Sequence, residues 1–229
     1  MIQNFTRFKY TSGLATATGM SAIVDNELSH DQITRFLAKL NSSKQQLWRE
    51  VKPLIRELET KESCNLIIDD TIEEKPYSDI NEINNYYYSH SKHMQVKGIN
   101  ILSAIAGFNK VAVPVDYHIV RKTQEAVDAK TGKVRMISEV TKNEVAREFI
   151  SQALQNRINF KYVLADIWFS SGENMQYIHS KKRKFIFGCK SNRMVKFNEV
   201  WHKLKDLPLA DEQVIYCYIR EFDINFSLD

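Results

Sequence analysis

A short apolar run that ends in two adjacent carboxylates constrains this chain more than any other feature. The run Leu66-Ile67-Ile68 is typical of a buried strand, and Asp69, Asp70 and Thr71 follow it directly. Carboxylates at the end of a buried strand are costly unless a positive group or a metal ion holds them. Because strand side chains alternate between two faces, Asp69 and Asp70 point in opposite directions. Only one of them can therefore face a given site.

A second apolar run, Tyr162 to Ala165, ends in Asp166. If the fold brings Asp70 and Asp166 together at neighbouring strand ends, the pair could hold two Mg²⁺ or Mn²⁺ ions. Such ions would activate a water or a 3′-hydroxyl and stabilise the leaving oxygen of a phosphoryl transfer. The alternative is that Asp166 caps the helix that follows it. The sequence leaves both roles open.

The order of the predicted elements indicates an α/β fold. Apolar periodicity and capping signals predict helices and strands, and the tyrosine-rich stretch 81–93 is interpreted as a polar loop. This order is that of a ribonuclease-H-like mixed sheet, in which two acids lie on neighbouring central strands, preceded by a helical region. The predicted helices are 29–40, 43–58, 141–157 and 172–178, and the predicted strands are 66–68, 95–106, 111–120, 162–165, 185–189 and 214–226.

The two N-terminal helices begin with capping-box patterns, Ser29 with Gln32 and Ser43 with Gln46, and the helix predicted over 141–157 begins with a third, Thr141 with Glu144. Pro53 should kink the second helix or end its first part. The pair could form a helix-turn-helix, or a hairpin that only covers a sheet edge. In the first case basic side chains would contact DNA phosphates. These side chains are Arg35, Lys39, Lys44, Arg49 and Lys52.

Bulk charge permits a nucleic-acid partner without requiring one. The formal net charge is +4 and the pI is near 8.8. Several basic residues near the predicted core are candidate DNA contacts. The run 181–184 could equally be a solvent-exposed segment that precedes the next strand. These candidates are Lys92, Lys97, Lys181, Lys182, Arg183 and Lys184.

The remaining composition indicates a soluble protein of a reducing compartment. Cys64, Cys189 and Cys217 fit neither a disulfide framework nor a zinc site. His90 and His93 have helical spacing for zinc but no further ligand nearby, so we interpret them as solvated loop residues. No membrane segment or signal peptide is evident, and we expect no membrane partner.

Several blocks together resemble bacterial insertion-sequence transposases of the DDE type. The first catalytic block of that family is similar to residues 67–77, followed by 87–92 and 96–100. The second block is similar to 164–171, and the strand after it to 184–193. Residues 29–37 resemble the helical region that these proteins carry ahead of the core.

The resemblance implies metal-dependent DNA cleavage at transposon ends, followed by strand transfer into target DNA. Asp70, the acid before the threonine, would be the first catalytic carboxylate and metal ligand, with Asp69 as the alternative if the register differs by one. Asp166 would be the second. The implied cofactor is Mg²⁺ or Mn²⁺. The implied partners are double-stranded DNA, at transposon ends and target, and a second copy in a homodimer. The implied location is the bacterial cytoplasm, in association with the nucleoid.

The family pattern also includes a third acid, a glutamate on a helix that follows an inserted β-rich region. Glu199, Glu212 and Glu221 are candidates by residue type, but none lies in a comparable block. We therefore expect a copy truncated inside the insertion, which does not complete transposition alone. The expected domains are 1–61, helical and DNA-binding; 62–190, the catalytic core; and 191–229, the start of the insertion.

Two other functions fit parts of the sequence. A remnant of a transposase could bind DNA or a full-length transposase without cutting. A phosphatase of the haloacid-dehalogenase type also begins with a strand that ends in aspartates. That motif needs its second acid two residues after the first, whereas Asp69 and Asp70 are adjacent and Thr71 and Ile72 follow.

Overall fold

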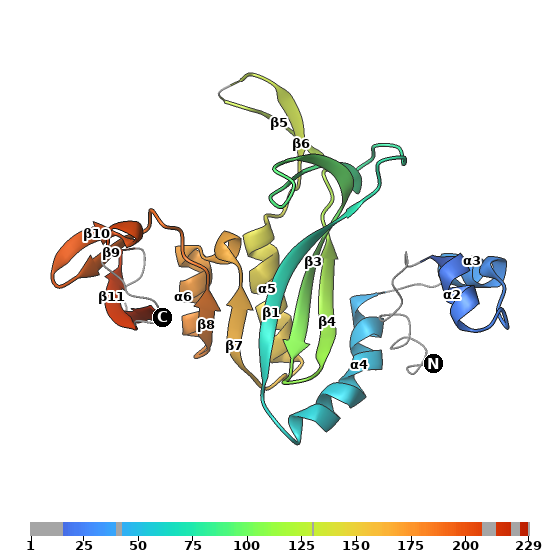
Figure 1. Cartoon of the computed structure of the whole chain (residues 1–229), viewed down its shortest axis with the longest axis horizontal. Helices are drawn as coiled ribbons and strands as arrows, with labels where there is room; N and C mark the ends of the chain where they lie inside the picture. Colours follow the sequence, from blue (N-terminus) through green and yellow to red (C-terminus); the bar gives the residue numbers. More distant parts are fainter. Residues whose placement is uncertain (1–15, 40–42, 130, 208–213, 221–224, 229) are drawn as a thin grey trace. The chain divides into compact units, whose positions relative to one another are not determined.

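The computed structural model describes residues 16–39, 43–129, 131–207, 214–220 and 225–228 (Figure 1). The chain forms two compact units, which divide between Ser43 and Lys44. The first unit contains α2 (Ala17–Ile23) and α3 (His30–Lys39). Ser29 Oγ accepts a hydrogen bond from the Gln32 N–H at 3.2 Å, and Gln32 Oε1 accepts one from the Ser29 N–H at 2.8 Å. This capping box was predicted from the sequence and is confirmed.

The second unit is built on a six-stranded mixed sheet of order β2-β3-β1-β7-β8, with β4 paired to β3. The pairs β1–β3 and β3–β4 are antiparallel, whereas β1–β7 and β7–β8 are parallel. This is the ribonuclease-H-like arrangement that the sequence predicted. The strands are β1 (Cys64–Glu74), β2 (Asn84–Ser89), β3 (Met94–Gly107), β4 (Ala112–Ile119), β7 (Phe160–Ala165) and β8 (Lys184–Phe187).

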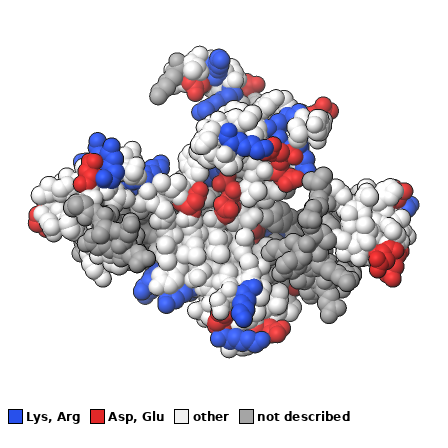
Figure 2. Space-filling model, viewed as in Figure 1, with Lys and Arg blue, Asp and Glu red and all other residues white. Residues whose placement is uncertain are grey.

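In the part of this unit that the structure describes, three helices cover one face of the sheet: α4 (Lys44–Glu59), α5 (Lys142–Gln155) and α6 (Gly172–Ser180). Leu66 and Ile68 of β1 pack there in the main core with Phe149 of α5. Apolar side chains of the opposite face, such as Leu164 and Ile186, belong to neither apolar cluster. Figure 2 shows that this opposite face is largely uncharged, with acidic side chains gathered along its upper border.

Helix α4 continues through Pro53, so the predicted break at Pro53 is wrong. A proline inside a helix removes one backbone hydrogen bond, but packing can compensate for that loss. Arg56 donates to the backbone oxygens of Asn156 and Arg157, at 2.5 and 2.9 Å, and Glu59 accepts from the Asn159 N–H at 2.7 Å. These contacts fix α4 to the end of α5 and place it in the second unit, whereas the sequence suggested a boundary after residue 61.

Several short strands differ from the prediction. The predicted loop 81–93 contains β2, in which Asn84, Tyr87 and Ser89 are buried. The hairpin of β5 (Gln124–Val127) and β6 (Val134–Ile137) was not predicted. The expected single segment 214–226 is an antiparallel pair within a separate four-stranded sheet. That sheet consists of β9 (Met194–Phe197), β10 (Val200–Lys203), β11 (Ile215–Ile219) and β12 (Asn225–Leu228).

None of the helices in the described residues is long and apolar enough to cross a membrane.

Candidate active site

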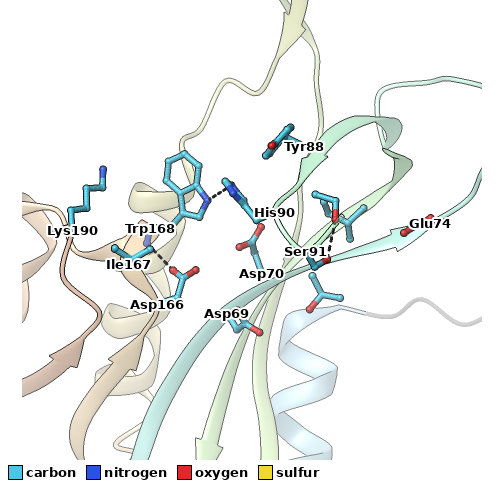
Figure 3. Close-up of a pocket in the computed structure, with 13 residues that line it drawn as sticks. Asp69, Asp70, Glu74, Tyr88, His90, Ser91, Asp166, Ile167, Trp168 and Lys190 are labelled. Carbon is cyan, nitrogen blue, oxygen red and sulfur yellow. Dashed lines mark hydrogen bonds between the residues drawn. The ribbon is translucent and has the colours of Figure 1, made fainter. Parts of the chain in front are cut away.

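Two of the predicted acids lie side by side, Asp69 within β1 and Asp166 directly after β7. The parallel register of β1 and β7 pairs Ile68 with Ala165, and Asp69 and Asp166 are the residues that follow this pair. Aligned residues of adjacent parallel strands point to the same face of a sheet. Asp69 and Asp166 therefore share the face opposite to the helices (Figure 3).

Asp70 points to the helix-covered face instead. Its carboxylate forms an ion pair with Lys142, at the start of α5, and accepts a hydrogen bond from Asn100 Nδ2 at 3.1 Å. The side chain of Asp70 is only 15% exposed. The alternation predicted from the sequence thus holds: Asp69 and Asp70 point to opposite faces of β1. Asp69, the stated alternative, is the residue that lies beside Asp166.

Local sequence signals fix the position of Lys142. Thr141 caps α5 in the predicted capping box: its side chain accepts from the Glu144 N–H, and the Glu144 carboxylate accepts from the Thr141 N–H at 2.7 Å. The hydrogen bonds from Thr141 hold the pKa of Glu144 below its usual value. The helix therefore begins at Lys142, close enough to Asp70 to neutralise it.

The charge on Asp69 is less well compensated. Partial burial raises the pKa of Asp69, and the neighbouring carboxylates of Asp70 and Asp166 raise it further. The structure shows no ion pair to Asp69 or Asp166 from the residues it describes. Oxygen ligands with an excess of negative charge are what Mg²⁺ and Mn²⁺ prefer.

Of the two roles that the sequence left open for Asp166, the structure shows the capping role. Its Oδ1 accepts a hydrogen bond from the Trp168 N–H at 2.9 Å and so caps η1 (Ile167–Phe169), a short 3₁₀ turn. The α-helix that follows, α6, has its own cap in Ser171, which accepts from the Asn174 N–H at 3.2 Å. Capping occupies one carboxylate oxygen, and Oδ2 is left for another ligand.

A depression of about 710 Å³ opens at these acids. Carboxylates line its floor, and aromatic side chains and one lysine line its walls (Figure 3). The lining residues that carry charge or an aromatic ring are Asp69, Asp70, Glu74, Tyr88, His90, Asp166, Trp168 and Lys190; Asp70 borders the depression although its carboxylate is paired with Lys142.

The basic residues predicted to contact DNA are scattered. Lys92 forms an ion pair with Glu74 at 2.6 Å, at the rim of the depression. Lys97 lies on β3 opposite Tyr86 of β2, outside the lining. The run 181–184 lies where β8 begins, and because β7 and β8 are parallel, this is the opposite end of the strands from Asp166.

Lys190 at the depression was missed by the sequence reasoning. It follows the carboxyl end of β8, whereas the prediction considered only the basic run at the start of that strand. Gly188 makes its position possible, because a Cβ there would lie 3.2 Å from the backbone nitrogen of Ile167. The close passage of this segment against η1 brings Lys190 to the wall beside Trp168.

The third acid was not located. Glu199 pairs with Lys196 in the β9–β10 hairpin, and Glu212 and Glu221 lie outside the described residues. No group of three or more histidine, cysteine or acidic side chains suited to a metal is present among the residues searched, which are the described ones. His90 lies in the depression against Trp168, rather than in a zinc site with His93.

Comparisons with known proteins identify the family of the chain. The sequence profile of the family described as DDE superfamily endonuclease matches residues 11–204, so the chain belongs to that family. A solved structure of the Drosophila P element transposase strand transfer complex is similar with a TM-score of 0.36 and 9% identity. The match covers 88% of this chain and 46% of that one, so this chain spans less than half its length. Comparison with curated proteins gave no match.

Proposed function

We propose that this chain is a transposase-type endonuclease that cleaves DNA at the ends of a bacterial insertion sequence and transfers the freed 3′ end to target DNA. Membership of the endonuclease family supports cleavage of DNA. One observation supports the mechanism: Asp69 and Asp166 lie side by side on an open sheet face, and none of the described residues forms an ion pair with either of them. Strand transfer and the bacterial origin rest on the sequence resemblance.

We assign Asp69 and Asp166 as the metal-binding and catalytic acids. Asp70 already has a partner in Lys142 and points to the other face of β1. Its part is to fix the start of α5 against the strand that carries Asp69.

The donor set fits Mg²⁺ or Mn²⁺, because carboxylate oxygens are the hard ligands that these ions select. When bound, the ions would polarise the scissile phosphate and stabilise charge on the attacking and leaving oxygens. Asp69 and Asp166 would supply protein ligands, and Lys190 would contact a phosphate beside them. With the third acid absent from the described residues, we expect cleavage to be slow and strand transfer by this chain alone not to be completed.

The proposed partner is double-stranded DNA, held largely by phosphate contacts, since the chain is basic overall. Lys190 and Lys92 lie at the depression or its rim, and the N-terminal helices remain candidates for a separate DNA contact. A homodimer is a further prediction, which sedimentation over a range of protein concentrations would check.

Matched aspartate variants test the proposal. The wild-type chain should bind Mn²⁺ in calorimetry and nick a supercoiled plasmid slowly in Mn²⁺. Asp69→Asn and Asp166→Asn should lose both properties, whereas Asp70→Asn should keep both. Loss in Asp70→Asn with retention in Asp69→Asn would overturn the assignment of the first acid.

A non-catalytic role is the second candidate, because only two of the three acids are located. It predicts salt-dependent DNA binding that is equal in wild type, Asp69→Asn and Asp166→Asn, with no nicking in either metal. Nicking that depends on Asp166 would exclude it.

A further inference from the structure

An aromatic wall stands beside the acids and has no role in holding metal. Tyr88 and His90 come from the end of β2 and the turn after it, and Trp168 comes from η1 (Figure 3). The rings of Tyr88 and His90 meet edge to face with centroids 5.0 Å apart, and those of His90 and Trp168 do so at 5.8 Å. Trp168 Nε1 donates to His90 Nε2 at 3.2 Å.

The wall is fixed in place but open to solvent. Asp166 caps the turn that carries Trp168, and the buried Asn174 side chain donates to the Phe169 backbone oxygen at 2.9 Å. Even so, Tyr88 is 47% exposed and Trp168 is 52% exposed. Rings that served only to pack η1 against β2 would be covered. A rigid, half-exposed pair of large rings is instead suited to bind another flat group.

We propose that Tyr88 and Trp168 form a stacking subsite for an unpaired nucleobase next to the phosphate that is cleaved. This rests on the proposed function, because it takes DNA as the ligand of the depression. Every base has an aromatic face, and stacking on a protein ring needs no particular base sequence. A base inside a duplex is stacked on its neighbours, so the subsite selects a nucleotide that has left the helix.

The surroundings favour a nucleotide over other flat ligands. Lys190 lies on the same wall as Trp168, where its ammonium can contact the phosphate of the stacked residue. Asp69 and Asp166 lie on the floor of the same depression, so the next phosphate along the strand would reach them through bound metal. The subsite would thus hold an opened DNA end so that the phosphate next to the stacked nucleotide lies at Asp69 and Asp166.

DNA binding without cleavage tests this subsite. Fluorescence anisotropy in Ca²⁺ would compare a blunt duplex with the same duplex carrying three unpaired nucleotides at one end. The wild-type chain should bind the open-ended duplex about tenfold more tightly, the scale of one base-stacking contact. 2-Aminopurine at the first unpaired position should be quenched on binding.

Trp168→Ala and Tyr88→Ala, which lie on different elements, should each lose the preference and the quenching, whereas Trp168→Phe should keep both. Trp201→Ala is the matched control, because Trp201 is 41% exposed and also edge-stacked, on Tyr218. Circular dichroism melting identifies any variant that does not fold.

Equal binding of the two duplexes by wild type, or a preference that survives in a folded alanine variant, would overturn the subsite. The same experiments distinguish failure of the proposed nuclease function from failure of the subsite. A chain that prefers the open end but never nicks contradicts the nuclease alone, and one that nicks without the preference contradicts the subsite alone.

Discussion

At the level of single residues, Asp69 and Asp70 show how one step along a strand changes what a carboxylate does. Asp70 lies against Lys142 and Asn100 on the helix-covered face, and its charge is neutralised there. Asp69 lies on the open face beside Asp166, where partial burial and two neighbouring carboxylates raise its pKa. The same side chain is paired with a cation at one position and lies beside other carboxylates at the next.

The raised pKa of Asp69 predicts that Asp69→Asn stabilises the metal-free protein at neutral pH. The folded state disfavours the charged carboxylate, so wild type carries a penalty at pH values above the raised pKa. That penalty disappears as the pH falls below the ordinary value of 3.8, where the carboxyl group is neutral in both states. Urea unfolding with EDTA should show a small gain for the variant at pH 7 that vanishes in acid. If the gain in unfolding free energy of Asp69→Asn over wild type grew as the pH fell, the predicted pH dependence would be contradicted.

Removal of Asp70 should have the opposite effect on stability. Asp70→Ala removes the carboxylate that pairs with Lys142 and leaves the buried Asn100 amide with only its 3.5 Å contact to the Thr71 backbone oxygen, which should lower the free energy of unfolding by about 1–3 kcal/mol. A double-mutant cycle with Lys142→Ala isolates the pair. Additive effects of the two substitutions would show that the ion pair contributes nothing.

At the level of elements, the central pairing of β1 with β3 depends on a close backbone approach. A Cβ on Gly98 would lie 2.4 Å from the carbonyl oxygen of Glu73, which is backbone and cannot rotate away. A Cβ on Gly107 would instead meet Cδ1 of Ile67 at 2.7 Å, the end of a flexible side chain. The two glycines therefore form a matched pair on one strand.

Gly98→Ala should destabilise the protein by about 1–3 kcal/mol, the usual range for overpacking, and Gly107→Ala by less. Denaturant unfolding of both variants checks the order. Because β1 also carries Asp69, we expect Gly98→Ala to weaken Mn²⁺ binding as well. Equal losses of stability in the two variants would show that the strand can shift at residue 98.

Elements were predictable where the signal was local. The capping boxes at Ser29 and Thr141 each depend on two residues three positions apart, and both formed as predicted. Strand β2 was missed because its burial comes from pairing with β3, as in Tyr87 opposite Val96. The break considered at Pro53 did not form, because contacts from Arg56 and Glu59, made to residues about a hundred positions away, hold α4 together.

At the level of the whole molecule, a metal that binds only the folded site must stabilise the entire second unit. At a free Mn²⁺ concentration ten times the dissociation constant, linkage predicts a gain of about 1.4 kcal/mol. Thermal melting should show this gain in wild type and lose it in Asp69→Asn and Asp166→Asn. Glu57→Gln, an exposed acid on α4, is the control that should keep it. A gain equal in all four proteins would indicate nonspecific ion binding.

By itself, the sequence determined the family, the ribonuclease-H-like order of elements and the two apolar runs that are followed by acids. Apolar runs, capping boxes and adjacent aspartates are patterns among residues close together in the sequence, so they can be recognised without knowledge of the tertiary contacts. Only the tertiary structure decided which aspartate faces Asp166, because that depends on the register between β1 and β7. It also brought Lys190, Tyr88 and Trp168 to one depression, since their proximity is created by strand pairing and by the passage of Gly188 against η1.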